Sequence, residues 1–305
     1  MILALTVQTL SVQNEFRTKM NASSQGPPPA FPDVAVLVGD LHASKKIDRD
    51  ERARLQDRLR ETLRALEELL RQDGLVPGAP APLATRLALT GGDEFQGVFR
   101  EPAAAVLVVR EVSERLHPHR VRFGLGRGPL ATRLADHPAE MDGPAFHRAR
   151  AAIEEAKTGR VLLVAAGFGD PWDETLTALF RLVGTVRERW TDRQLEYVRA
   201  VRRHLAAPAD TPPADVPPAD TSADLLQVLA GSVDLTGRRD PFRGAQRPAA
   251  ERLGISPATL SRGLRNAGFD AITSAEHAAI RLLFWLAGYA SGRPAAKAHA
   301  PGGTP

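Results

Sequence analysis

Residues 90–97, TGGDEFQG, lie between two apolar runs, TRLALT and EFQGVF. Both runs have the β-branched and aromatic character of strands, and Gly91-Gly92 supplies the positive φ angles of tight hairpin turns. The stretch therefore predicts a β-hairpin that carries two adjacent carboxylates, Asp93 and Glu94, at its tip. Glycine and aspartate are also common in plain solvated turns, so the hairpin by itself does not define a site.

Outward from the hairpin, the apolar patterns predict alternating strands and helices. A β-branched run at 34–38 predicts a buried strand that ends at Gly39-Asp40, and leucines spaced by three and four predict an amphipathic helix over 48–72. The further elements are the hairpin strands at 85–90 and 94–99, a helix at 101–116, a strand at 121–126, a helix at 143–157 and a further strand at 161–166. This order is that of the ferredoxin-like βαββαβ unit.

The predicted topology brings Asp40 to the hairpin. In this unit the first and third strands lie side by side and antiparallel, so the end of the first meets the start of the third. Asp40, Asp93 and Glu94 should therefore share one rim of the sheet. Converging carboxylates repel one another unless a cation neutralises them, and Mg²⁺ or Mn²⁺ is the expected occupant. Ser44 and Lys45, ahead of the long helix, would cradle phosphates at its N-terminus.

Composition is compatible with a nucleotide or nucleic-acid partner. The chain has 305 residues, is 43% hydrophobic, and carries a formal net charge of +4 with a pI near 9.8. Its cations are nearly all arginines, which suit phosphate. The absence of cysteine excludes disulfides and thiolate chemistry. The opening MILALTVQTL lacks a positive leader and is too short to cross a membrane, so we expect a cytoplasmic protein without a membrane partner.

Residues 34–165 resemble the SatD family, whose motifs GD…SK, GDEFQG, RFGLGRG and DGPAFHRAR occur here in the same order. More distantly, the arrangement is similar to GGDEF diguanylate cyclases and class III nucleotide cyclases. In these palm-fold enzymes two metals, held by strand-end and hairpin carboxylates, activate a ribose hydroxyl for attack on an α-phosphate. The resemblance implies that Asp40, with Asp93 or Glu94, would hold the metals, and that a purine nucleotide would be the ligand or substrate.

The helix AFHRAR…AKTGR is similar to the ALYxAKxxGRN helix of GGDEF domains. That similarity implies that Arg150, Lys157 and Arg160 point towards phosphates. The Asn and Arg pair of class III cyclases is not matched, since His147 stands near the Asn place and no Arg follows at the usual spacing. Turnover is therefore left open, and His147 fits equally a phosphate or base contact and a partly buried structural histidine. The glycines of RFGLGRGPL are interpreted as letting a strand run close beneath a bound substrate.

Residues 245–269, AQRPAAERLGISPATLSRGLRNAGF, have the pattern of a helix-turn-helix. One helix ends at Leu253-Gly254, and a second follows an N-cap serine with Pro257 in the first position. The stretch resembles the tri-helical module of sigma-factor-like and LuxR-like regulators, and an ordinary helical hairpin or a protein-binding module is the alternative. Side chains of the kinds that contact bases and phosphates in a major groove are predicted at Ser256, Ala258, Thr259, Ser261, Arg262 and Arg265.

Other helices are predicted around this motif. Thr191 and Gln194 form a capping box for a helix that continues to residue 205. Either this helix or the stretch 224–235 supplies the first helix of the module. Thr273 and Glu276 are predicted to cap a final helix, 275–289, whose apolar character needs a partner, so we expect a homodimer.

Together these patterns predict an α+β protein, a ferredoxin-like βαββαβ palm domain followed by an all-α helix-turn-helix domain. The leading hypothesis is a transcriptional regulator that combines Mg²⁺-dependent nucleotide binding with sequence-specific binding of double-stranded DNA. The alternatives are a nucleotidyl cyclase that makes a cyclic or linear nucleotide signal, and a protein-interaction module with a degenerate palm. The predicted segments are a disordered extension at 1–33 with Met20 as the alternative start, the palm-like domain at 34–168, a helical connector at 169–206, a proline-rich linker at 207–223, the helix-turn-helix domain at 224–290 and a disordered tail at 291–305.

Overall fold

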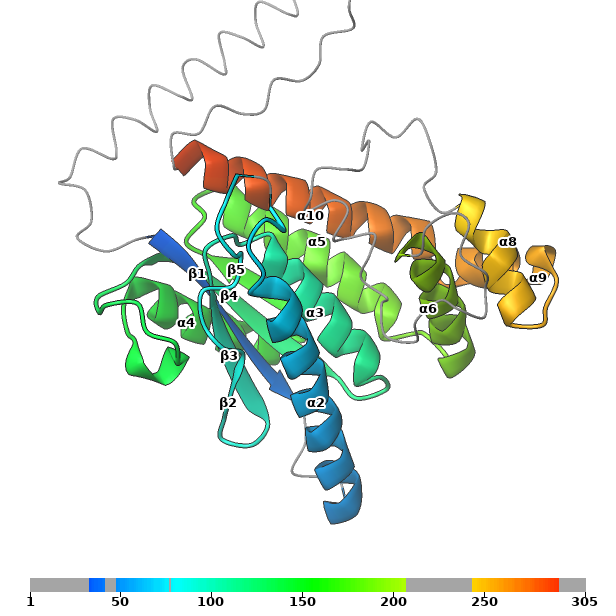
Figure 1. Ribbon diagram of the computed structural model, residues 1–305, viewed down its shortest axis with the longest axis horizontal. Coiled ribbons are helices and arrows are strands. Elements are labelled where there is room, and N and C mark those ends of the chain that lie inside the picture. The colour runs from blue at the N-terminus through cyan, green and yellow to red at the C-terminus, as the bar shows by residue number, and fades with distance from the viewer. Residues whose placement is uncertain (1–32, 42–47, 77, 207–242, 291–305) are drawn as a thin grey trace, which may run out of the picture. The chain divides into compact units, whose positions relative to one another are not determined.

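The computed structural model describes residues 33–41, 48–76, 78–206 and 243–290. Its centre is a five-stranded sheet of order β2-β3-β1-β4-β5 (Figure 1). β1 pairs antiparallel with β3 and β4, β2 pairs antiparallel with β3, and β5 pairs in parallel with β4. The expected α+β class and the expected pairing of the first strand with the third are confirmed. The strands are β1 (Asp33–Leu41), β2 (Ala88–Thr90), β3 (Glu94–Phe99), β4 (Val121–Pro129) and β5 (Leu163–Ala166).

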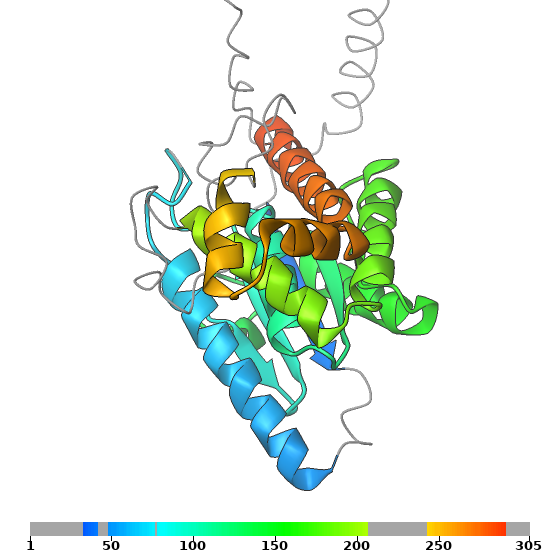
Figure 2. The same cartoon turned by 90° about the vertical axis from the view of Figure 1, so that its right-hand side faces the viewer.

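Helices cover both faces of this sheet. On one side lie α2 (Arg49–Leu70), α3 (Ala104–Arg115) and α5 (Trp172–Arg187), and on the other lies α4 (Pro144–Gly159) (Figure 1 and Figure 2). The predicted leucine stripe of α2 is buried, because its spacing directs one helix face into the apolar core. Along β1, Ala35 and Leu37 join that core, which leaves the alternate residues of the strand for the α4 face.

α4 lies close to β4 because β4 carries glycine at alternate positions. A Cβ added at Gly124 or Gly126 would overlap backbone atoms of Ala149 in α4. We expected these glycines to make room for a bound substrate. That interpretation is wrong for both positions, because a helix of the same chain fills the space.

Several predicted boundaries are also wrong. β2 begins at Ala88 instead of at residue 85, and β4 continues to Pro129 instead of ending at residue 126. β1 continues to Leu41 instead of ending at Gly39-Asp40, because β3 and β4 pair with its last residues from both sides. The final helix, α10 (Phe269–Ala290), begins before residue 275. Thr273 and Glu276 are therefore buried residues of its interior and not caps, since this part of α10 packs against neighbouring helices.

The C-terminal helices pack against one another and against the sheet region. α6 (Asp192–Ala206) contacts both α8 (Arg243–Arg252) and α9 (Pro257–Asn266), while α10 contacts α5, α3 and α9. The predicted capping box of α6 is confirmed, since Gln194 N–H donates to Thr191 Oγ1 at 3.2 Å and Thr191 N–H donates to Gln194 Oε1 at 2.9 Å. α6 thus packs beside α8 and α9, while the alternative first helix, 224–235, lies outside the described residues.

Several predicted segments lie outside the described residues. These are most of the N-terminal extension with Met20, the phosphate-cradle residues Ser44 and Lys45, the linker, the stretch 224–235 and the tail. Among the helices that the structure describes, none has the length and apolar character needed to cross a membrane. The division into domains and the homodimer stay predictions.

Candidate functional site

The rim where β1 ends and β3 begins gathers the predicted carboxylates. Asp40 lies directly opposite Glu94 in the register of the two strands, and the N–H of Leu41 donates to the carbonyl of Asp93 at 3.0 Å. Directly paired residues of antiparallel strands share a face, so the side chains of Asp40 and Glu94 lie on one side of the sheet. The expected approach of Asp40 to the hairpin is confirmed. We call Asp40, Asp93 and Glu94 the carboxylate rim.

The hairpin that carries two of these residues is held in place by its glycines and by α2. Gly91 and Gly92 have φ angles of 75° and 88°, as the turn requires. Gln56 of α2 donates its side-chain amide to the carbonyl of Gly92 at 2.8 Å. Thr90 donates to Glu94 Oε1 at 3.2 Å, which fixes that carboxylate. Thr90 and Gln56 were not among the predicted residues of the site, although the cross-strand position of Thr90 opposite Glu94 followed from the hairpin.

Two cations on α4 oppose the rim. Arg150 donates to Glu94 Oε2 at 2.6 Å, and Lys157 Nζ lies 3.5 Å from Asp40 Oδ1. Lys157 also lies 3.1 Å from Glu154 Oε1. Positions 150 and 157 are two turns apart on the helix, so both cations project from one side of α4. The structure places them against carboxylates, where the resemblance implied phosphates.

Asp40 is unfavourably placed when it is ionised. Partial burial raises the pKa of Asp40, and the charges of Asp93 and Glu94 raise it further, although Lys157 lowers it. Burial alone would lower the pKa of Lys157, but its hydrogen bond to Glu154 and the charge of Asp40 raise it overall. A carboxylate that is held among other carboxylates is stabilised by an added cation.

The donor set of the rim fits a hard divalent cation in part. Asp40 and Glu94 supply the carboxylate oxygens that Mg²⁺ and Mn²⁺ prefer, and Mg²⁺ commonly uses only one or two carboxylates together with water and phosphate. Within the described ranges, no group of three or more His, Asp or Glu side chains is arranged to hold a metal ion. The rim therefore fits a metal that arrives with a phosphate, and not a metal held by protein ligands alone.

The other two predicted nucleotide contacts near α4, His147 and Arg160, are exposed to solvent. His147 has an exposed side chain whose Nε2 lies 3.5 Å from Asp142 Oδ1, at the start of the helix. Arg160 is the exposed C-cap residue, in the left-handed region with a φ of 54°. Within the described part of the chain, neither side chain forms a hydrogen bond or ion pair with the rim.

The predicted DNA-contacting residues lie around the outer side of α9. Ser256 is the N-cap, since its Oγ accepts from the N–H of Thr259 at 3.1 Å. Leu260 and Leu264 are buried, as predicted. Arg265 donates to Ser261 Oγ at 2.8 Å. Of the predicted contacts, those exposed to solvent are Ser256, Ala258, Arg262 and Arg265, and those half-buried are Thr259 and Ser261.

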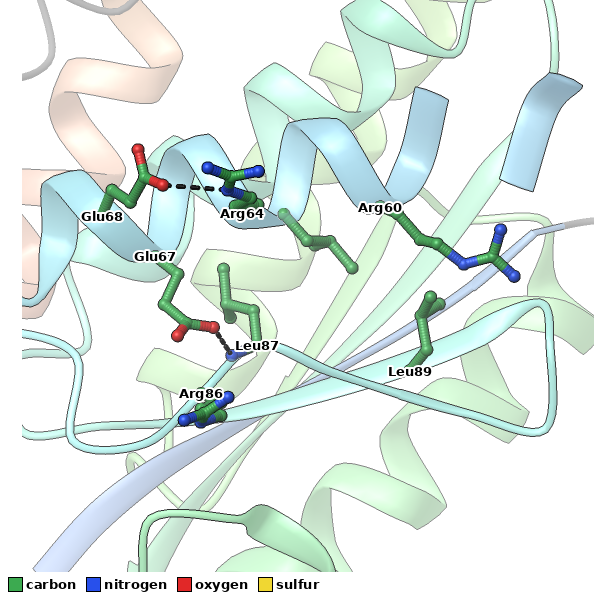
Figure 3. A pocket seen from close by; sticks show the side chains of 8 residues that line it. Arg60, Arg64, Glu67, Glu68, Arg86, Leu87 and Leu89 are labelled. Atoms are coloured by element: carbon green, nitrogen blue, oxygen red, sulfur yellow. Dashed lines mark hydrogen bonds and ion pairs between the residues drawn. The ribbon is translucent and has the colours of Figure 1, made fainter. Parts of the chain in front are cut away.

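A hollow of about 380 Å³ lies between α2 and the segment that leads into β2 (Figure 3). Its charged groups already have partners: Arg64 pairs with Glu68 at 3.0 Å, and Glu67 accepts from the N–H of Leu87 at 3.0 Å. Leu89 lines it and alternates with Thr90, so the hollow opens on the face of the sheet opposite to Glu94. It is therefore separate from the carboxylate rim.

The fold and the rim together define an α+β protein in which an acidic sheet edge faces a cationic helix. The model of the SatD family matches residues 34–204, which is more than half of the chain, so this chain belongs to the SatD family. A search of curated proteins finds no match to it. The matched region contains the whole sheet, the rim and most of α6, and it ends before α8, α9 and α10.

Proposed function

We propose that the carboxylate rim binds a purine nucleotide together with Mg²⁺ or Mn²⁺, and that α8 and α9 form a helix-turn-helix that binds double-stranded DNA. On this proposal the first four strands are a ferredoxin-like palm and the protein is a transcriptional regulator that responds to a nucleotide. The observation that carries the proposal is the cross-strand pair of Asp40 and Glu94, opposed by Lys157 and Arg150 from one helix.

The ion pairs of the rim suggest how a nucleotide would be held. A divalent cation at the rim would neutralise Asp40 and Glu94 and coordinate phosphate oxygens. Arg150 and Lys157 would then exchange their carboxylate partners for phosphate. Arg150 is half exposed, so it moves at little cost, and its planar fork suits a phosphate group.

Calorimetric titration of ATP and GTP, with and without Mg²⁺ or Mn²⁺, tests this half of the proposal. We expect binding that requires the divalent cation and that weakens at least about tenfold in Asp40→Ala, because a ligand bond to a charged group is lost. Asp57→Asn is the matched control, since Asp57 is an exposed acid of α2 that pairs with Arg60. Binding that is independent of metal, or unchanged in Asp40→Ala, contradicts the proposal.

DNA binding rests on the exposed residues of α9. Electrophoretic mobility shifts over a range of salt concentrations should show a steep salt dependence, and loss of one phosphate contact lowers that slope by about 1. We expect this for Arg262→Ala or Arg265→Ala. Arg193→Ala is the control, since Arg193 lies on α6 and pairs with Glu196. A slope near zero for the unmodified protein contradicts DNA binding.

The second candidate function is a nucleotidyl cyclase, which the same pair of neighbouring carboxylates favours. Incubation with ATP or GTP and Mn²⁺ or Mg²⁺, followed by chromatography, would then yield a cyclic or linear nucleotide product that is absent in Asp40→Ala. Nucleotide binding without product supports the regulator. The absence of both nucleotide and DNA binding would leave the protein-interaction module.

A further inference from the structure

A second cavity lies where the end of α3, the start of β4, the end of α5 and the start of α6 meet. Its volume is about 150 Å³. Its wall contains three guanidinium groups, from Arg120, Arg122 and Arg187, against two carboxylates, from Glu114 and Glu188. His117 and His119 line it as well. Glu188 pairs with Arg122 at 2.7 Å and with Arg120 at 3.3 Å, while His117 lies 3.4 Å from Asp192 and His119 lies 3.4 Å from Glu51. Each carboxylate of the wall is thus shared by two or more cations.

Arg187 is the central donor of this wall. Its side chain is only 7% exposed, and its Nη2 pairs with Glu114 at 3.2 Å and with Glu276. Among the described residues, its Nε and Nη1 are buried and have no hydrogen-bond partner. Burial lowers the pKa of Arg187, although Glu276 and Glu114 oppose that effect. A buried donor that lacks an acceptor is unfavourable, so an acceptor in the cavity that the guanidinium group can reach by turning would be stabilised.

Behind the wall, buried arginines outnumber the carboxylates with which they pair. Glu114 and Glu276 are buried and pair with three arginines, Arg110, Arg187 and Arg202. Arg199 adds a fourth guanidinium group, which donates to the backbone carbonyl of Glu114. The nearby Glu111 pairs with Arg115. Buried charges are tolerated when they are matched, and here the cations outnumber the carboxylates.

We propose that this cavity binds a small oxyanion, a phosphate or carboxylate group, towards which the guanidinium group of Arg187 would turn its buried, unpartnered N–H groups. Arg120, which is half exposed, would supply a further donor by exchanging its partner Glu188 for the anion. A water molecule takes about 30 Å³ of liquid, so the cavity holds a group of roughly five heavy atoms, which is the size of phosphate or acetate. This site is distinct from the nucleotide site and does not depend on it.

An anion in this cavity would affect both the sheet and the C-terminal helices. Arg122 of the wall is the cross-strand partner of Asp40 in the β1–β4 register, so the cavity lies one strand away from the carboxylate rim. Arg187 and Glu114 pair with Glu276 of α10 and Arg202 of α6. The oxyanion would thus stabilise the junction between the sheet and the C-terminal helices.

Titration of the full chain with sodium phosphate, and separately with sodium acetate, tests the proposal. Sodium chloride balances the ionic strength, and the readouts are the melting temperature and tryptophan fluorescence, since Trp190 lines the cavity. We expect the melting temperature to rise with phosphate or acetate and not with chloride. Comparison of the two anions identifies which group the cavity prefers.

Three variants locate the binding. Ser113→Leu fills the cavity without removing a charge and should abolish the response. Arg120→Gln removes a half-exposed cation of the wall and should weaken binding about tenfold. Arg181→Gln, on the exposed side of α5, should bind as the unmodified protein does.

The outcome separates this site from the rim. Asp40→Ala should keep the full response, because the carboxylate rim plays no part in it. A response that survives in both Ser113→Leu and Arg120→Gln, or no response to either anion in the unmodified protein, overturns the proposal. If Ser113→Leu fails to fold, Arg120→Gln alone tests anion binding, because the Arg120 side chain is half exposed and its replacement should leave the fold intact.

Discussion

The carboxylate rim and the buried ionic cluster behind α3 use the same kinds of side chain in opposite surroundings. The buried ionic cluster consists of Arg110, Glu114, Arg187, Arg202 and Glu276, whose side chains are 0–7% exposed. In the rim, Asp40 is 21% exposed, and the Arg150 that faces Glu94 is 52% exposed. Exposed ion pairs exchange partners at little cost, whereas a buried charge that loses its partner is strongly unfavourable.

This difference suggests different roles. The buried ionic cluster joins α3, α5, α6 and α10, which are far apart in the sequence, and it holds them in one arrangement. The rim joins β1, β3 and α4 through pairs that a metal and a phosphate could replace. Four substitutions test the contrast.

Glu276→Ala should have the largest effect, because it leaves Arg110, Arg187 and Arg202 without one of their two carboxylates. The free energy of unfolding, from urea denaturation, should fall by about 3–5 kcal/mol. Glu196→Ala removes an exposed partner of Arg193 and should cost about 0–1 kcal/mol. Equal losses of stability in the two variants would show that the ion pairs of the buried ionic cluster contribute no more than an exposed ion pair.

Gly126→Ala should disturb the α4 side of the sheet. Its Cβ would overlap the backbone of Ala149, so we expect a loss of about 1–3 kcal/mol in denaturant unfolding. Nucleotide binding should weaken as well, because α4 carries both cations of the rim. Gly244→Ala, where an added Cβ meets nothing, is the control and should leave stability and binding nearly unchanged.

Arg150→Gln should separate binding from stability. Nucleotide affinity in calorimetry should fall about tenfold, which is the loss of one charge-assisted hydrogen bond. The free energy of unfolding should change by less than about 1 kcal/mol, because Arg150 is half exposed. A large loss of stability with unchanged affinity would assign Arg150 to the fold instead.

Asp40→Asn should have the smallest effect on stability, and it should raise stability where Glu276→Ala and Gly126→Ala lower it. The pKa of Asp40 is raised in the folded chain above its ordinary value of 3.8, so the folded state holds the proton more tightly than the unfolded state. Stability is therefore lost as the pH rises from 3.8 through the folded pKa, and the substitution removes that loss. The variant should melt at a higher temperature than the unmodified protein at neutral pH, and the difference should close below pH 3.8. A lower melting temperature at neutral pH would mean that the ion pair with Lys157 dominates.

Features that depend on neighbours in the chain could be predicted from the sequence. The leucine spacing of α2, the glycines of the hairpin and the serine cap of α9 are each decided within a few residues, and each is confirmed. The meeting of Asp40 with Glu94 was predictable too, because the ferredoxin-like order of elements places the first strand beside the third.

Features that depend on packing could not be predicted in this way. Thr273 and Glu276 have the spacing of a capping pair, yet α10 begins earlier and buries both. The partners of Arg150 and Lys157 were also missed, because a long cationic side chain takes whichever acceptor the fold brings within reach.

The sequence by itself determined the strand and helix types, the hairpin and the gathering of acidic residues at one edge, because periodicity, glycine and chain order act locally or through simple topology. Only the tertiary structure decided that four helices bury an unequal set of arginines and glutamates around Glu114 and Glu276. No local pattern encodes such a cluster, since its members come from distant helices, and their mutual attraction offsets the cost of removing them from water only when all of them are brought together.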